Sequence, residues 1–281
     1  MLMIYSDAHL HSNPMHGLGA YKIAVKVKES GGWFMALVSL TPIHYNLPLN
    51  LEGFLKTVDI VIKECEAANK AGIKAVCLAG IHPAAIDKLL NVARVEKVRK
   101  IAVKVLKYIK RRIREGRLAG IGEVGRPHYP THPISIVVSD LIMEEALEVV
   151  KETNSIAHLH LEAGGEATVL NIARKLMKIG LAGRHVIIHH ADVETAKAAI
   201  KEGINVTVLS KLEILRGLRG LLSRALIESD FLDDPSRPCV ATCPWDIPRN
   251  MQKALKEGIL SDKETSKIFI DNIQSVYRVE Y

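Results

Sequence analysis

The stretch IYSDAHLHSN, residues 4–13, decides between two folds that the rest of the chain allows. An apolar run here ends in Asp7, His9 and His11, and alternation along an extended strand places the two histidines on the same side. An open doubly wound sheet usually carries a glycine-rich turn after its first strand. Because histidines occupy that turn here, the stretch favours the other parallel architecture, a closed barrel.

The remainder of the sequence supplies the repeating units of such a barrel. Short apolar runs alternate with longer segments of helical periodicity, which is typical of parallel strands joined by crossover helices. We expect helices in segments such as 51–71, 92–115, 139–153, 165–179 and 193–202, and strands at 2–7, 33–40, 73–79, 118–124, 155–160, 185–190, 204–210 and 224–230. Without a linker or a break in composition, these units predict one α/β domain over residues 1–281, a single (β/α)8 TIM barrel. Residues 248–273 are expected as C-terminal helices packed outside it.

Charge and hydropathy narrow the classes of partner. The 281 residues carry a net charge of +7, and many of the lysines and arginines lie in residues 96–117. We interpret that segment as a helix with a solvated basic face, although a basic surface also keeps nucleic acid among the candidate substrates. The sequence lacks the pattern of a signal peptide and any long uncharged apolar run, so we expect no membrane span.

The cysteines indicate the redox setting. Cys65, Cys77, Cys239 and Cys243 are too few and too scattered for a disulfide framework in a chain of this length, which predicts a reduced, cytoplasmic protein. Cys239 and Cys243 could hold a metal only with two further ligands from elsewhere. We interpret them as incidental residues of a loop.

Histidines and carboxylates gather where the predicted strands end. In a barrel these ends share one mouth, where catalytic groups are found. Together, imidazole and carboxylate suit Zn²⁺, Mn²⁺ or Fe²⁺ better than Ca²⁺ or Mg²⁺. The set exceeds what one tetrahedral ion uses, so we predict two divalent ions per chain, with Glu123 as the natural bridge. In strand order the residues are Asp7, His9, His11, His82, Glu123, His158, His160, His189, His190 and Asp230.

Four short motifs in this order resemble one branch of the metal-dependent hydrolases. DAHLH, GIHP, GIGEVG and ESD are similar to the motifs of TatD-related proteins within the amidohydrolase superfamily, and the resemblance spans nearly the whole chain. The segments GEVGRPHY and ESDFLDDPSRP are similar to an archaeal TatD-related subgroup.

The resemblance implies a set of ligands and a mechanism. A hydroxide between the two ions attacks phosphorus or carbon, and Asp230 accepts the proton as general base, so Asp230 and Glu123 are the expected catalytic residues. For the fifth strand we choose His160 over His158, and for the sixth His190 over His189, with the second of each pair in reserve. The implied ligands are His9, His11 and Asp230 for one ion, His160 and His190 for the other, and Glu123 for both.

Three further residues are candidates for binding substrate. Arg126 and His128 follow Glu123 closely and could hold a phosphate or carboxylate at the mouth, and the alternative is an arginine that pins a loop. His82 could orient a ligand, contact substrate or cap the turn before Pro83.

The substrate expectation follows from the resemblance and the basic surface. A phosphodiester is the leading interpretation, with a TatD-like nuclease on single-stranded DNA as its specific form. The alternatives are hydrolysis of a small amide, lactone or phosphoester, and a non-catalytic nucleic-acid-binding barrel. Two departures weaken the nuclease reading: TatD nucleases commonly place an arginine after the fifth-strand histidine, where this chain has Leu161 and Glu162, and GRPHY replaces the usual GLD.

Overall fold

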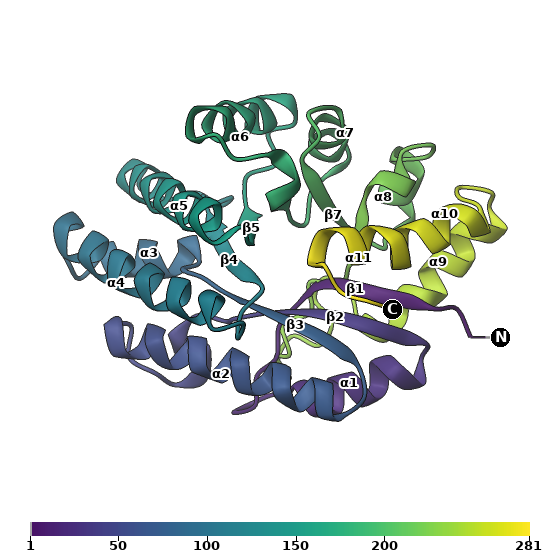
Figure 1. The fold of residues 1–281 in the computed structure, drawn as a ribbon, viewed down its shortest axis with the longest axis horizontal. Coiled ribbons are helices and arrows are strands. Elements are labelled where there is room, and N and C mark those ends of the chain that lie inside the picture. The colour runs from purple at the N-terminus through teal and green to yellow at the C-terminus, as the bar shows by residue number, and fades with distance from the viewer. Residues whose placement is uncertain (1) are drawn as a thin grey trace.

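The computed structural model describes residues 2–281, in which parallel strands follow one another around a barrel (Figure 1). Within that range the sheet has eight strands, and strands adjacent in sequence are adjacent in space. The predicted (β/α)8 barrel is therefore confirmed. The strands are β1 (Tyr5–Leu10), β2 (Gly32–Val38), β3 (Lys74–Ala79), β4 (Gly120–Gly125), β5 (Ile156–His160), β6 (Val186–Ile188), β7 (Asn205–Leu209) and β8 (Leu226–Glu228).

Helices form a layer around the sheet, and the yellow C-terminal segment returns to the first strands (Figure 1). Their buried apolar faces pack against the strands to make the main core. The helices are α1 (Ala20–Glu29), α2 (Leu51–Lys70), α3 (Pro83–Leu90), α4 (Val95–Arg114), α5 (Pro133–Thr153), α6 (Glu166–Ile179), α7 (Val193–Lys201), α8 (Leu212–Gly217), α9 (Ile247–Lys256), α10 (Asp262–Ser266) and α11 (Asn272–Tyr277).

Two helix starts differ from the sequence prediction for the same reason. The helix α3 was not expected, and α5 begins at Pro133 instead of residue 139. Each begins at the proline of a His-Pro pair, and the Nδ1 of the preceding histidine accepts a hydrogen bond from the backbone N–H two residues on, at 3.0 Å for His82 and 3.2 Å for His132. The proline suits the first helical position because it needs no hydrogen-bond acceptor there.

The end of the chain does not simply join the outer layer. The helix α9 contacts α8, but Ile273, Val276 and Tyr277 pack with residues of the barrel interior such as Phe34 and Val38. We expected residues 248–273 to pack outside the barrel, and Ile273 departs from that expectation. The helix α11 thus contributes side chains to the inner core.

Two strands that carry candidate ligands are irregular. The pairing of β1 with β2 changes register around His9, and the pairing of β4 with β5 changes register around Glu123. An extra residue in a strand re-aims the side chains beside it, and such bulges are frequent at active sites. The first strand also ends at Leu10, beyond the predicted range 2–7, so His9 lies within it.

The barrel closes between its last and first strands at the end where the candidate ligands lie. Backbone hydrogen bonds join Asp230 N–H to the His9 carbonyl at 3.1 Å and His11 N–H to the Phe231 carbonyl at 2.7 Å. The buried carboxylate of Asp233 ties the two following loops together by accepting hydrogen bonds from the backbone N–H groups of Asn13, Leu18 and Gly19.

The expectation for the second pair of cysteines was wrong. Cys239 and Cys243 form a disulfide in the loop after β8, with their Cα atoms 4.8 Å apart. Cys239 has a positive φ of 52°, which turns the short loop back on itself and brings the two residues within reach of each other. Cys65 and Cys77 are free thiols.

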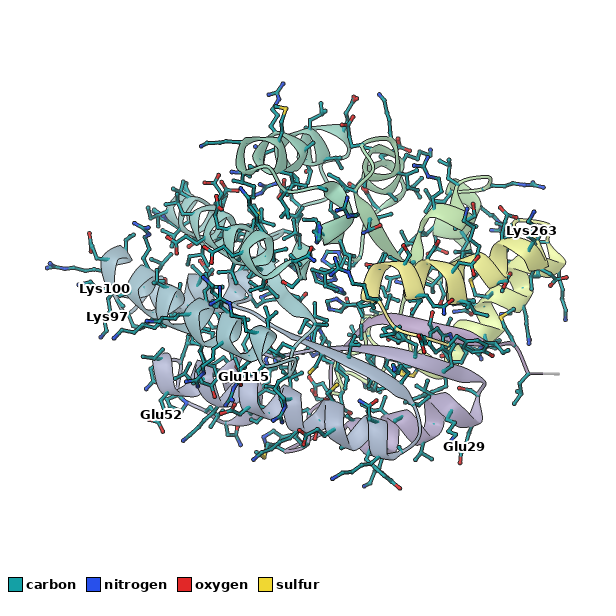
Figure 2. All side chains as sticks on the ribbon, viewed as in Figure 1. Glu29, Glu52, Lys97, Lys100, Glu115 and Lys263 are labelled. Atoms are coloured by element: carbon teal, nitrogen blue, oxygen red, sulfur yellow. A yellow bond between two sulfur atoms is a disulfide. The ribbon has the colours of Figure 1, made fainter. Side chains whose placement is uncertain are left out.

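The basic segment forms α4, as predicted. It buries Val98, Val105 and Ile109 against its neighbours, while Lys97 and Lys100 extend from the outer surface of the molecule (Figure 2). None of the helices in residues 2–281 combines the length and the apolar character that crossing a membrane requires.

Candidate metal centre

Side chains from several strand ends converge on Glu123 at the mouth of the barrel. Its carboxylate is buried, and imidazole nitrogens approach it from several sides. They are His189 Nε2 at 2.6 Å, His160 Nδ1 at 3.3 Å, His11 Nε2 at 3.7 Å, His9 Nε2 at 3.8 Å and His82 Nε2 at 3.9 Å.

The donor atoms form overlapping groups of the size that a metal ion needs. In each group one nitrogen or oxygen atom per residue lies within 4.8 Å of the others. The structure thereby brings together the predicted residues His9, His11, Glu123, His160, His190 and Asp230, along with His82, His128 and His189. The groups are His9 with His11 and Asp230; His82 with Glu123 and His160; His128 with His160 and His190; and His9 with His189 and Glu228.

Buried nitrogen atoms without partners are what a metal-binding cluster without its metal would contain. His9 Nε2, His160 Nε2 and His189 Nδ1 are buried and have no hydrogen-bond partner among residues 2–281. Leaving a buried polar atom without a partner costs about 1–3 kcal/mol. A bound cation would satisfy such atoms, and a mixed imidazole and carboxylate shell suits Zn²⁺, Mn²⁺ or Fe²⁺.

The protonation states match those of metal ligands. Burial lowers the pKa of His9 and of His189 well below the ordinary value, and lowers that of His82 to about 3. Burial alone would raise the pKa of Glu123, but the surrounding histidines, His189 first among them, hold it well below its usual range. An ionised carboxylate surrounded by neutral imidazoles is the state in which these groups bind metal.

Asp230 stands at the edge of this cluster. Its Oδ1 atom lies 3.9 Å from His11 Nε2, and its side chain keeps 25% of its surface exposed. Burial of the carboxyl group, with the negative charges of Glu123 and Asp7, raises the pKa of Asp230 to about 8. A cation bound between these carboxylates would act in the opposite direction.

His158 does not reach the centre. Both of its ring nitrogens are engaged behind His9: Nδ1 lies 2.8 Å from His9 Nδ1, and Nε2 lies 3.0 Å from the Tyr277 hydroxyl. Of the two fifth-strand histidines, His160 is the one whose ring faces Glu123. Strand alternation predicted that His158 and His160 lie on one face, but it could not predict that His158 lies deeper in the barrel than His160.

The two adjacent histidines that directly follow β6, His189 and His190, both lie at the centre. His189 stacks on His9 with ring centroids 4.1 Å apart and hydrogen-bonds Glu123, whereas His190 Nε2 lies 3.2 Å from His160 Nδ1. A positive φ of 42° at His190 lets consecutive residues point the same way. Sequence alternation predicts that neighbours diverge, so it could not indicate this arrangement.

Arg126 is held away from the mouth by an internal ion-pair network. Its guanidinium is bidentate to Glu162 at 2.7 and 2.9 Å and also contacts Asp140 and Asn171. The structure therefore favours the loop-pinning alternative over substrate binding. Arg126 belongs to the segment GRPHY, so the two departures from the TatD pattern, GRPHY and Glu162, supply the two partners of this ion pair.

The other two candidates lie at the rim. The ring of His82 caps α3 through Nδ1 and turns Nε2 towards Glu123, which combines two of its three expected roles. His128 is exposed, with its ring centroid 4.5 Å from that of His160. Its position at the opening is compatible with contact to a substrate.

Two buried carboxylates next to the cluster were not predicted as ligands: Asp7 was counted among the strand-end residues without a ligand role, and Glu228 was not singled out. Glu228 accepts a hydrogen bond from the His190 N–H at 2.6 Å, and Asp7 accepts from the N–H groups of His9 and Ser229. Both are fully buried. Their position two residues from a predicted ligand was the available signal, since alternation places i and i+2 on one face.

A small cavity of about 110 Å³ opens beside Glu123. His11, His82 and Lys88 are among the polar residues that line it. Apolar walls come from Leu40, Ile43 and Leu232.

Known proteins share this chain's sequence pattern. The profile of the family described as TatD related DNase matches residues 6–278. An uncharacterised protein of Methanocaldococcus jannaschii is 28% identical over 280 residues, which cover 98% of this chain and 96% of that protein.

Solved structures share the fold at low sequence identity. A TatD-like protein of Archaeoglobus fulgidus is 19% identical, with a TM-score of 0.65 over 98% of this chain and 100% of that one. A TatD homologue of Escherichia coli is 13% identical, with a TM-score of 0.67 over 99% and 100% of the two chains. A mutant of a phosphotriesterase-like lactonase of Deinococcus radiodurans is 13% identical, with a TM-score of 0.64 over 98% and 96%.

Proposed function

The chain belongs to the family of TatD-related DNases and is a metal-dependent hydrolase, and we propose that it cleaves phosphodiester bonds with two divalent ions. The observation that carries the proposal is the convergence of five histidines on the Glu123 carboxylate, with buried ring nitrogens left without partners among residues 2–281. His9, His160 and His189 approach one oxygen of Glu123 and His11 and His82 approach the other, which supports a bridging role.

In this proposal His9, His11 and Asp230 would hold one ion and His160 and His190 the other, with Glu123 available to both. Divalent ions in such a site supply a water molecule of lowered pKa and stabilise negative charge on the substrate. Asp230 accepts the proton of the attacking water on its carboxylate, because it is the partly exposed carboxylate at the edge of the cluster. His189 keeps Glu123 in place through their hydrogen bond.

The net charge of +7 supports a polyanionic substrate such as single-stranded DNA. A second candidate, a small ester, lactone or amide, is favoured by the narrow cavity beside Glu123, whose apolar walls suit a compact group. Arg126 is paired with Glu162 and so is removed as a candidate for binding phosphate, which also favours the small substrate. A cytoplasmic location completes the proposal.

The test is reconstitution with metal and a panel of substrates. The protein is stripped with a chelator, reloaded with Mn²⁺ or Zn²⁺, and assayed on single-stranded DNA, bis(p-nitrophenyl) phosphate, p-nitrophenyl esters and lactones. We expect metal-dependent turnover of the phosphodiesters. Turnover confined to esters or lactones would replace the leading candidate by the second, and DNA binding without turnover of any substrate would support a non-catalytic barrel.

A further inference from the structure

His9 and His11 present the same ring nitrogen to the centre but are held in different ways. The Nδ1 of His11 lies 2.8 Å from the backbone carbonyl of Val38. A carbonyl only accepts, so His11 must carry its proton on Nδ1 and leaves Nε2 free to bind a cation. His9 has another imidazole, that of His158, at the corresponding place, with the two Nδ1 atoms 2.8 Å apart. The Nδ1 atom of His158 can either donate or accept a hydrogen bond, so this contact alone does not show which nitrogen of His9 carries the proton.

The hydroxyl of Tyr277 removes this ambiguity. It lies 2.7 Å from the backbone carbonyl of Ala8 and 3.0 Å from His158 Nε2. A tyrosine hydroxyl has one proton, and the carbonyl can only accept it. Towards His158 the hydroxyl oxygen must therefore act as acceptor, which places the ring proton of His158 on Nε2.

The direction of each remaining bond follows. A neutral imidazole with its proton on Nε2 has a lone pair on Nδ1, so His158 accepts from His9 Nδ1–H. The Nε2 lone pair of His9 is then free, and this is the buried atom that lacks a partner within residues 2–281 and lies 3.8 Å from Glu123 Oε1. All three side chains are at least nine-tenths buried, which excludes bulk water as a competing partner.

We propose that His158 and Tyr277 are positioning residues that fix the tautomer of His9, through a one-way series of hydrogen bonds ending on the Ala8 carbonyl. The inference rests on the proposed role of His9 as a metal ligand. Partners that orient a ligating histidine typically change metal affinity about 10- to 100-fold when they are removed. The helix α11 is thereby part of the metal centre although none of its side chains would touch an ion.

The tautomers themselves can be read without metal. Long-range ¹H–¹⁵N correlation spectra of the metal-free protein with labelled histidine should show His9 protonated at Nδ1 and His158 protonated at Nε2. Spectra of His9→Asn and His158→Asn assign the two rings. The reverse pattern, or a mixture in both rings, would overturn the proposal, and a role confined to packing predicts neither tautomer.

Metal affinity supplies the second readout, by competition with a chelating dye. Tyr277→Phe should weaken binding of one ion about 10-fold, and His158→Leu about 100-fold. His158→Asn should recover most of the loss because its amide oxygen replaces the Nδ1 acceptor. Tyr5→Phe is the matched control: it removes an equally buried hydroxyl from the same strand as His9, bonded to Ser30 at 2.8 Å, and should leave affinity unchanged.

The outcomes separate this inference from the proposed function. If the wild-type protein binds no ion, the proposed function fails, and the spectra still decide the order of the hydrogen bonds. If the wild type binds metal and Tyr277→Phe binds it equally well, the positioning role fails and the proposed function stands.

Discussion

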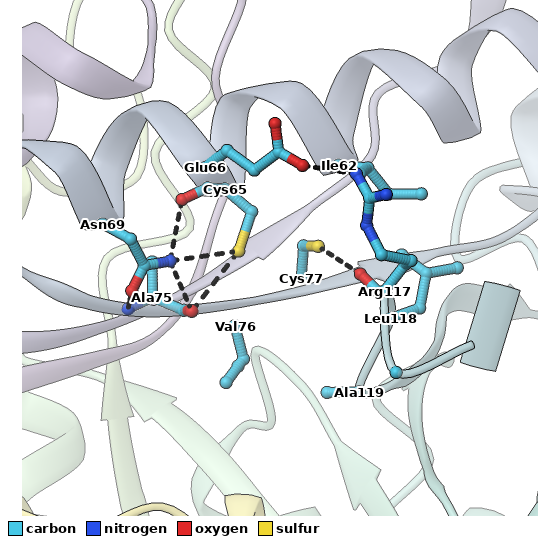
Figure 3. A pocket seen from close by; sticks show the side chains of 11 residues that line it. Ile62, Cys65, Glu66, Asn69, Ala75, Val76, Cys77, Arg117, Leu118 and Ala119 are labelled. Atoms are coloured by element: carbon cyan, nitrogen blue, oxygen red, sulfur yellow. Dashed lines mark hydrogen bonds and ion pairs between the residues drawn. The ribbon is translucent and has the colours of Figure 1, made fainter. Parts of the chain in front are cut away.

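Polar side chains at the two ends of the barrel differ in whether they have hydrogen-bond partners. At the end where β3 begins, a cavity of about 290 Å³ is lined by Cys65, Asn69 and Cys77 (Figure 3). The Cys65 thiol donates to the Ala75 carbonyl, the Cys77 thiol donates to the Arg117 carbonyl, and Asn69 pairs with the backbone of Ala75 in both directions. These polar side chains have partners in the nearby backbone.

At the mouth, by contrast, ring nitrogens of His9, His160 and His189 are buried with no hydrogen-bond partner in the described part of the chain. The carboxylates of Asp7, Glu123 and Asp230, which repel one another when ionised, are also held close together there. Polar groups bonded to the local backbone stabilise the fold, whereas converging groups without partners are arranged for a ligand. The variants below test that distinction, and each should act on one end alone.

Glu123→Gln should have the largest effect. The amide keeps the shape of the side chain but loses the charge that would lie between the ions, so we expect activity to fall at least about 10⁴-fold while the protein stays folded. Metal content and steady-state rates are the measurements. Retention of two ions per chain with full activity would contradict the central role of this carboxylate.

Asp230→Asn should follow, with a loss of kcat of about 10²- to 10⁴-fold, because an amide cannot accept the proton of the attacking water. Folding should be unaffected, since the side chain lies partly exposed at the edge of the cluster. The rates are compared in metal-saturated protein, so that weaker metal binding is not mistaken for the loss of the general base. An unchanged kcat would show that a group other than Asp230 accepts the proton.

Asp7→Asn should alter stability in a pH-dependent manner. Burial raises the pKa of Asp7 to about 7, so its contribution to the stability of the metal-free protein is complete below about pH 4 and is lost as the pH rises through 7. The variant should therefore be more stable than the wild type at pH 8, by on the order of 2 kcal/mol, with no such advantage at pH 4. Urea unfolding of both metal-free proteins at several pH values measures this difference, and a gap that does not vary with pH would refute it.

Cys77→Ala should have the smallest effect and should act at the other end only. The side chain is 3% exposed, and its loss should lower the free energy of unfolding by about 1 kcal/mol. Metal content and kcat should stay within about twofold of the wild type, because the residue shares no partner with the mouth. A marked loss of bound metal would show that the two ends are coupled.

The sequence predicted the parts that follow from periodicity and missed those that depend on distant contacts. Alternating strands and helices predicted the barrel, and the position of polar residues at strand ends pointed to the residues that gather around Glu123. The register shifts around His9 and Glu123 leave no trace in a pattern of apolar residues. The depth of His158 depends on Tyr277, which lies 119 residues away. Likewise, Arg126 was ambiguous until the fold placed Glu162 beside it.

The closure of the barrel between Asp230 and His9 sets an order of events during synthesis. His9 and His11 leave the ribosome first, yet the backbone hydrogen bonds that seat them come from Asp230 and Phe231, which are translated more than two hundred residues later. A nascent or prematurely terminated chain therefore lacks the assembled centre. Truncation before β8 removes these two backbone contacts while leaving His9 and His11 in the chain.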